Sequence, residues 1–377
     1  MLKFVRLMLV LTMWLGLAAS AQAEPVDERI LLTFIPNVQF APFYVGIEDG
    51  YFAEAGFNVS LEHLQEPEVL DLVAVGQAKF GIVSGEQVIL ARSRGRDVVY
   101  VFEWFQQYPV GLVYSSALDL SDLANLQGMA IGIPGRFGAS YSGLTTLLGS
   151  AGLSEADIDL REIGFNAPEV FCLGAIDAAI VYVNNEPLQI RNLVADGDCG
   201  AVSDVEVITV ASQVDLVSNG LIVSRAYVDE DPDTVARMVS GLTGALRSVI
   251  DNPAGAYIAS LKHVDSLPAE EALLNALESA AEEQIAFLES DPDRADIARS
   301  RRQLASDLGE RFDRATLTQL NVLLNTIELW DAEVIGFSDL SSWEAMRDTL
   351  DSMGFLDDGA GRLQDAFTNR FVAGSDG

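Results

Sequence analysis

Short apolar segments alternate with helix-like segments from Arg29 onward, and this alternation occurs in two successive units. Strands that alternate with helices predict mostly parallel sheets with helices on both faces. The chain is therefore expected to have an α/β fold with two similar units. The expected strands span 30–35, 58–64, 80–83 and 98–102 in the first unit, and 130–133, 160–163, 178–183 and 205–210 in the second.

Glycine and proline mark the ends of several expected helices. Segment 40–55 has helical spacing and stops at Gly56, and segment 68–75 stops at Gly76. In the second unit, a glycine-rich loop over 134–140 precedes an expected helix over 141–151. A further strand is expected over 220–224, after the second unit, and the remainder of the chain from Asp231 is mainly helical.

The first residues have the pattern of an export signal. Lys3 and Arg6 precede an apolar run over 7–19, and Ala21-Gln22-Ala23 fits a small-x-small cleavage site. We predict a signal peptide over residues 1–23, with an uncleaved membrane anchor as the alternative. The protein is then expected in the periplasm or at the extracytoplasmic face of the cell membrane.

Charge and cysteine content limit the partners and the chemistry. The net charge of −33 excludes nucleic acid as a partner, because phosphate binding needs a basic face. Cys172 and Cys199 are the two cysteines, so an exported chain could form one disulfide, within the second unit, or keep two buried thiols.

Known catalytic motifs are missing from the sequence. It has no G-x-S-x-G elbow, no phosphate-binding P-loop and no dinucleotide fingerprint. His63 and His263 are the only histidines, and no spacing suggests a metal site. We therefore expect a protein that is not an enzyme and that uses neither a cofactor nor a metal.

Polar and aromatic loops follow five of the expected strands. Ligands in open α/β sheets bind beyond the carboxyl ends of the strands, so these loops supply the candidate binding residues. Their aromatic rings favour a flat heteroaromatic ligand, and their amides can pair with its polar edge. The candidates are Asn37, Gln39, Phe40, Ser84, Gly85, Glu86, Trp104, Tyr108, Arg136, Phe137, Gly138, Ala139, Ser140, Tyr182, Asn184 and Asn185.

An anionic ligand remains an alternative from the residues alone. Arg136 is the only basic residue in these loops, and the helix that follows Gly138 could offer backbone N–H groups to an anionic oxygen. The strongly negative charge of the chain opposes the capture of anions at long range.

We expect the main source of affinity to be the stacking of a flat ligand ring between Trp104 and Tyr182, one from each unit.

Four motifs stand out in the sequence: Phe40–Gly46 with Glu48–Phe52 and Gly56-Phe57, then Gly76–Ile82, Gly132–Gly138 and Phe367–Phe371. Together they resemble a known family, the extracytoplasmic solute-binding proteins of ABC importers, in the branch related to thiamine-pyrimidine synthases. Lys79 stands where an acid is usual in the second motif. The cysteine-rich iron motif and the active-site histidine of the synthase members are not present, which favours transport.

The resemblance implies a bilobed type II periplasmic-binding-protein fold, with two Rossmann-like lobes joined by a two-segment hinge. Lobe 1 is expected over 28–113 plus 214–377, and lobe 2 over 114–213. The implied function is the substrate-binding component of an ABC transporter, a monomer that captures riboflavin outside the cell and delivers it to membrane permease subunits. Alternatives are a thiamine pyrimidine precursor of the formyl-aminopyrimidine type, an alkylsulfonate or nitrate, or a secreted enzyme on this fold.

Overall fold

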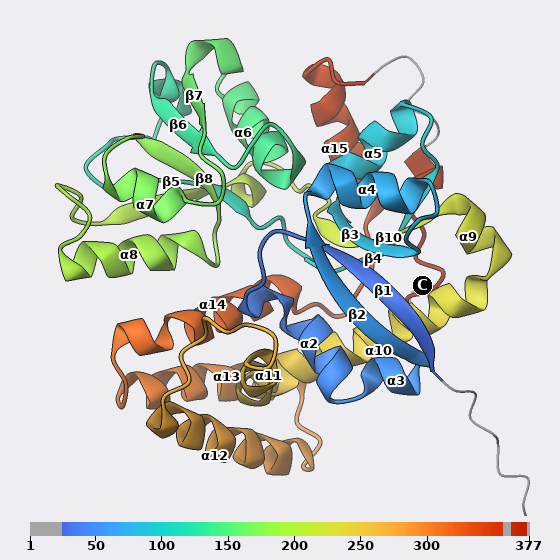
Figure 1. Ribbon diagram of the computed structural model, residues 1–377. Helices are drawn as coiled ribbons and strands as arrows, with labels where there is room; N and C mark the ends of the chain where they lie inside the picture. Colours follow the sequence, from blue (N-terminus) through green and yellow to red (C-terminus); the bar gives the residue numbers. More distant parts are fainter. Residues whose placement is uncertain (1–24, 357–362, 375–377) are drawn as a thin grey trace, which may run out of the picture.

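Two β-sheets form the centres of two lobes in the computed structural model, which describes residues 25–356 and 363–374 (Figure 1). The predicted signal peptide and its cleavage site lie outside the described residues. None of the helices in the described ranges combines the length and the apolar character needed to cross a membrane.

The first sheet has the strand order β2-β1-β3-β10-β4. Strands β2 and β3 pair in parallel with β1, whereas β10 is antiparallel to both β3 and β4. Strand β10 is the strand expected over 220–224, and it returns to the first sheet after the chain has built the second. The bounds are β1 Val26–Thr33, β2 Phe57–Leu64, β3 Phe80–Ser84, β4 Val98–Glu103 and β10 Asn219–Ser224.

The second sheet repeats this arrangement with the order β7-β6-β8-β5-β9. Here β5 is the strand that runs against its neighbours β8 and β9. The prediction of mostly parallel sheets is confirmed, with one antiparallel strand in each. The bounds are β5 Val110–Ser115, β6 Ala130–Ile133, β7 Asp159–Glu162, β8 Ala178–Tyr182 and β9 Val205–Thr209.

Strand β5 is not among the strands expected from the sequence. The apolar run over 110–115 follows the aromatic loop after β4 directly, so the sequence does not distinguish this strand from the loop. The boundary predicted between residues 113 and 114 falls inside β5, whose residues pair with β8 and β9.

Helices cover both faces of the sheets, and helices make up most of the described chain between β10 and Asp365 (Figure 1). The helices are η1 Val38–Phe40, α2 Ala41–Glu48, α3 Tyr51–Glu54, α4 Glu66–Ala74, α5 Gly85–Ser93, η2 Leu123–Leu126, α6 Gly138–Ser150, η3 Glu155–Asp157, α7 Ala167–Cys172, α8 Glu186–Asp196, η4 Val210–Ser212, α9 Arg225–Glu230, α10 Pro232–Asp251, α11 Pro253–Ser260, α12 Glu271–Leu288, α13 Arg294–Gly309, α14 Arg314–Trp330, α15 Leu340–Ser352 and η5 Leu363–Asp365.

Two of these helices differ from the sequence prediction. The helix expected over 40–55 is divided into η1, α2 and α3, and Gly50, which has a φ of 85°, separates α2 from α3. Helix α6 begins at Gly138, inside the segment expected as a loop, so the first turn of α6 contains Ala139 and Ser140.

Alternating side chains of β1 enter different hydrophobic clusters. Ile30 and Leu32 pack into the cluster that contains the buried side of α10, whereas Leu31 packs with α4 on the other face. This is the period of two that a strand covered on both faces requires. The carboxyl end of β1 is thereby held in a fixed position beside the second sheet.

Two segments connect the sheets and complete a bilobed type II periplasmic-binding-protein fold. Residues 104–109 lead from β4 to β5, and residues 210–218 lead from β9 back to β10. Cys172 at the end of α7 forms a disulfide with Cys199, so the pairing that the sequence left open is present and lies within the second unit. Helix α14 packs against both α8 and η1, so the C-terminal helices contact both lobes.

Candidate functional site

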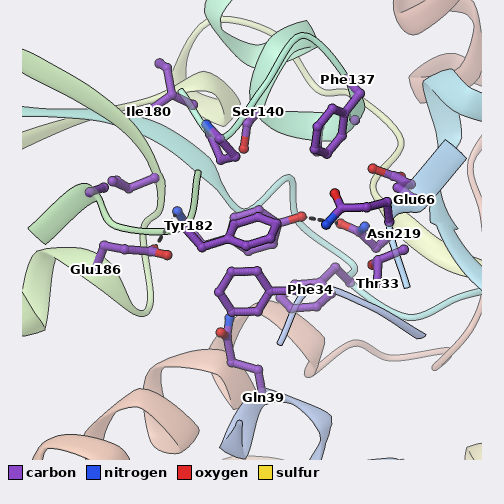
Figure 2. Close-up of a pocket in the computed structure, with 18 of the residues that line it drawn as sticks. Thr33, Phe34, Gln39, Glu66, Phe137, Ser140, Ile180, Tyr182, Glu186 and Asn219 are labelled. Carbon is purple, nitrogen blue, oxygen red and sulfur yellow. Dashed lines mark hydrogen bonds between the residues drawn. The ribbon is translucent and has the colours of Figure 1, made fainter. Parts of the chain in front are cut away.

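A pocket lies between the two sheets, where the carboxyl ends of their parallel strands meet (Figure 2). Strand β10 contributes its first residue, because an antiparallel strand begins at the edge where its parallel neighbours end. The lining residues are Thr33, Phe34, Gln39, Phe40, Gln65, Glu66, Trp104, Phe105, Pro134, Phe137, Gly138, Ala139, Ser140, Gly164, Phe165, Ala167, Ile180, Val181, Tyr182, Glu186 and Asn219.

Aromatic rings from both lobes meet in this pocket. Phe34 follows β1 and Phe165 follows β7, and their ring centroids lie 4.6 Å apart at an interplanar angle of 82°. Phe105 and Tyr182 form a second edge-to-face pair, with centroids 6.1 Å apart. Each pair spans the interface between the lobes, so the rings can enclose a flat molecule only when the lobes are close together.

Phe34 has an unusual backbone conformation for a residue with a side chain. Its φ is 69°, in the left-handed region that L-residues other than glycine rarely adopt. Such a conformation costs about 1–3 kcal/mol and persists when the surrounding structure imposes it. The strain places the Phe34 ring at the pocket directly after the buried strand β1.

One hydrogen bond crosses the pocket between β8 and β10. The Tyr182 hydroxyl donates to Oδ1 of Asn219 over 2.9 Å, and the Tyr182 backbone N–H donates to Oε2 of Glu186 over 3.0 Å. Burial raises the pKa of Tyr182 above its usual value, so its hydroxyl stays protonated and remains a donor. Burial also raises the pKa of Glu186 to about 7. Glu186 therefore exchanges a proton near neutral pH.

A second polar group lies at the start of α4. The backbone N–H of Ser84 donates to Oε1 of buried Glu66 over 2.5 Å, and the Ser84 hydroxyl is hydrogen-bonded to both Glu66 and Glu86. Glu66 lines the pocket, whereas Glu86 lies behind it and is fully buried. This network fixes the orientation of one carboxyl group toward the pocket.

Half of the predicted ligand residues lie in the lining, and the structure brings them together from both lobes. Trp104 reaches the pocket but belongs mainly to the core, where its ring lies 5.5 Å from Phe40 and 5.8 Å from Trp330. The ring that faces Tyr182 is Phe105 instead of Trp104. The predicted residues in the lining are Gln39, Phe40, Trp104, Phe137, Gly138, Ala139, Ser140 and Tyr182.

Several predicted residues lie outside the lining and connect the lobes. The Asn185 side chain donates to Oε1 of Gln39 over 3.2 Å, and the Asn184 side chain donates to Thr326 on α14 over 2.7 Å. The Tyr108 hydroxyl donates to the carbonyl oxygen of Ala139 over 2.8 Å. These buried bonds hold the two lobes in the arrangement that forms the pocket.

The remaining predicted residues serve local structure. Asn37 caps η1 by accepting a hydrogen bond from the backbone N–H of Gln39. Ser84, Gly85 and Glu86 lie behind Glu66, at the junction of β3 and α5. The Gly85 backbone N–H donates to the carbonyl oxygen of Ser218 over 3.0 Å.

Arg136 is placed at the surface, away from the pocket lining. Its guanidinium pairs with Glu155 over 2.6 Å and also with Glu162. The pocket lining, within the described residues, includes the carboxyl groups of Glu66 and Glu186 but no lysine, arginine or histidine. The local charge therefore favours a neutral ligand over an anion.

No group of His, Cys, Asp or Glu in the described part of the chain is arranged to hold a metal ion.

The pocket lining also contains residues that the sequence does not identify, because their place in the pocket depends on where the strands end. Thr33 and Phe34 were placed inside an expected strand that in the structure ends at Thr33. Gln65 follows β2, Glu66 is the first residue of α4, and Gly164 and Phe165 follow β7; none of them is among the candidates from the sequence. Phe105, Pro134 and Glu186 stand in the candidate loops but are not among the ligand residues expected from the sequence. The other lining residues outside that set are Ala167, Ile180, Val181 and Asn219.

Two lobes with a pocket between the strand ends define a ligand-binding protein of the periplasmic-binding-protein fold. The chain belongs to the NMT1/THI5-like family, whose model matches residues 37–256. A solved structure, the ligand-binding component of an ABC-type import system from Staphylococcus aureus, superposes with a TM-score of 0.60 at 10% identity. The superposition covers 92% of this chain and 97% of that one, which supports the same fold.

Two curated relatives are binding proteins for small heterocycles. The riboflavin-binding protein RibY of Chloroflexus aurantiacus is 29% identical, over 95% of this chain and 90% of the relative. The formylaminopyrimidine-binding protein of Halalkalibacterium halodurans is 26% identical, over 69% of this chain and 76% of the relative. The likeness to RibY thus extends over nearly the whole chain.

Proposed function

We propose that this protein is the substrate-binding component of an ABC importer that captures riboflavin outside the cell and delivers it to membrane permease subunits. The observation that carries the proposal is the pocket between the lobes, with aromatic rings from both sides and no cationic side chain in its described lining. The near full-length similarity to a riboflavin-binding protein supports the same ligand class.

The pocket chemistry matches a neutral ring system with a polar edge. Phe34, Phe165 and Phe105 provide faces and edges for stacking, which contributes about 0.5–1.5 kcal/mol per aromatic pair beyond area burial. Gln39 and Asn219 offer amide NH2 groups that can donate to a polar ring edge, whereas their oxygens already accept hydrogen bonds from Asn185 and Tyr182. An alkylsulfonate or nitrate would meet two carboxyl groups and no compensating cation, so these ligands fit less well.

Export and the permease partner are part of the same proposal. A receptor of this class acts on the outer side of the cell membrane, which agrees with the predicted signal peptide over 1–23. A secreted enzyme is less well supported, because the pocket side chains Glu66 and Glu186 are bonded to Ser84 and Tyr182 of the protein itself.

The ligand class is tested by extracting the small molecules that co-purify with the exported protein and identifying them by mass spectrometry. We expect a flavin. Competition between riboflavin and formylaminopyrimidine then separates the two heterocycles, with Arg136→Ala as a control for a charged residue outside the pocket. Displacement of bound riboflavin by an equimolar pyrimidine, or the recovery of the pyrimidine alone, would contradict the proposal.

A further inference from the structure

The carboxyl group of Glu66 lies against the first turn of α6, across the interface between the lobes. A Cβ atom on Gly138 would overlap with Oε2 of Glu66, so only glycine fits at this position. Gly138 also has a φ of 65°, which disfavours any other residue. The close approach of the Glu66 oxygen to α6 therefore depends on glycine at position 138.

The amino end of α6 has no side-chain cap of its own. Phe137 occupies the N-cap position and forms no capping hydrogen bond, and residues Gly138, Ala139 and Ser140 line the pocket. The first N–H groups of a helix have no partner within the helix, and they lie at the positive end of its dipole. Such a position normally attracts a phosphate or another anion.

Glu66 is the more acidic member of a buried pair of acids. Burial raises the pKa of both carboxyl groups, whereas the hydrogen bonds from Ser84 lower the pKa of Glu66. The Ser84 hydroxyl carries one hydrogen, so it can donate to one of its two carboxyl partners and must accept from the other. The Ser84 backbone N–H also donates to Glu66, which favours the charged form there. Burial raises the pKa of Glu86, and the charge of Glu66 raises it further, so Glu86 holds the proton.

Glu66 itself directs one oxygen into the pocket. Only 7% of the residue is exposed, and Oε1 takes the bonds from Ser84, whereas Oε2 faces Gly138 and the pocket. The Oε2 oxygen thus lies beside Gly138, next to the free N–H groups at the amino end of α6 with which a ligand phosphate would interact. Any phosphate brought there would meet a like charge in a nearly dry site.

We propose that Glu66 makes the pocket selective against ligands that carry a phosphate ester, because its carboxylate occupies the amino end of α6. This inference rests on the proposed function and refines it. Among flavins, the pocket accepts riboflavin and rejects flavin mononucleotide, which is the phosphate monoester of riboflavin. Placing like charges side by side is a common means of rejecting a wrong ligand.

The test compares wild-type protein with Glu66→Gln, which keeps the size of the side chain and removes its charge. Glu68→Gln is the matched control, because Glu68 lies on the same helix and is exposed. We expect wild-type protein to bind flavin mononucleotide at least about 100-fold more weakly than riboflavin. Glu66→Gln should reduce this ratio by at least about tenfold, and Glu68→Gln should leave it unchanged.

A second arm uses inorganic phosphate, so that the inference does not depend on flavin binding. Phosphate should raise the melting temperature of Glu66→Gln more than that of wild type or Glu68→Gln. If Glu66→Gln does not fold, Glu66→Asp, which withdraws the carboxylate from α6, takes its place. If wild type binds no flavin, the proposed function fails, while the phosphate arm still tests Glu66. Equal phosphate responses in all variants, or a wild type that binds both flavins equally, would overturn the inference.

Discussion

Tyr182 at the end of β8 donates its hydroxyl hydrogen to Oδ1 of Asn219 at the start of β10, over 2.9 Å. The two strands belong to different sheets, so this bond is one of those that join the lobes, and it crosses the pocket itself (Figure 2). Both residues line the pocket. The bond therefore requires the lobes to be close together, and both of its partners are available to contact a ligand.

The first prediction distinguishes the contribution of the Tyr182 hydroxyl from that of the Tyr182 ring. Tyr182→Phe keeps the ring and removes the hydroxyl, so we expect riboflavin affinity to fall by only about two- to tenfold. Tyr182→Ala removes the ring as well and should weaken binding by about tenfold to a hundredfold. Titration calorimetry measures both changes. Equal losses in the two variants would show that the ring itself does not contact the ligand.

The second prediction contrasts a core ring with a pocket ring. Trp104 is 3% exposed and packs in a cluster with Phe40 and Trp330, so Trp104→Ala should cost about 3–5 kcal/mol of folding stability. Phe165 is only partly buried, and Phe165→Ala should leave stability nearly unchanged while affinity falls about tenfold. Chemical denaturation and ligand titration are carried out on each variant. A stable Trp104→Ala protein that has lost only its affinity would contradict the assignment of Trp104 to the core.

The third prediction concerns pH and Glu103 at the end of β4. Burial raises the pKa of its carboxyl group to about 8, from 4.5 in an exposed chain. The unfolded chain therefore loses this proton at a lower pH than the folded protein does. The resulting stabilisation is complete below about pH 4.5 and is lost as the pH rises through 8.

Glu103→Gln removes this titration and keeps a neutral side chain of similar size. Between pH 5 and pH 8, the unfolding free energy of the wild type should fall more steeply than that of the variant. Urea unfolding at several pH values provides the comparison. Parallel pH profiles for the two proteins would mean that Glu103 is ionised in the folded state.

The fourth prediction concerns the disulfide in the second lobe. Cys172 and Cys199 are 27 positions apart, and closing a loop of this size contributes about 3–4 kcal/mol on the chain-entropy model. The double variant Cys172→Ser with Cys199→Ser should lose stability of this order and keep its affinity, because neither residue lines the pocket. Thiol titration of the denatured, unreduced wild type should detect no free thiol. Two reactive thiols would show that the bond does not form.

Much of the fold could be predicted because buried strands are continuous apolar runs. The segment Ala178–Tyr182, for example, is recognisable as a strand from its composition alone. Strand β5 could not be separated from the aromatic segment before it. Its position in the second sheet also depends on pairing with β8 and β9, which lie far along the chain.

The site could be predicted only in part, for a different physical reason. Loops after strands are visible in the sequence, and they led to Gln39, Phe137 and Tyr182. Which loops face each other depends on how the lobes pack, so Glu66 and Asn219 could not be recognised. The ion pairs that draw Arg136 to Glu155 and Glu162 are likewise formed by residues 19 and 26 positions away.

The central claim is that the pocket between the lobes binds riboflavin. It is tested most directly by adding purified, ligand-free protein to riboflavin and following the flavin fluorescence. We predict saturable quenching with one flavin per chain, little dependence on salt because the ligand is neutral, and weaker binding in Phe165→Ala. Flavin fluorescence that is unchanged at saturating protein would contradict the account.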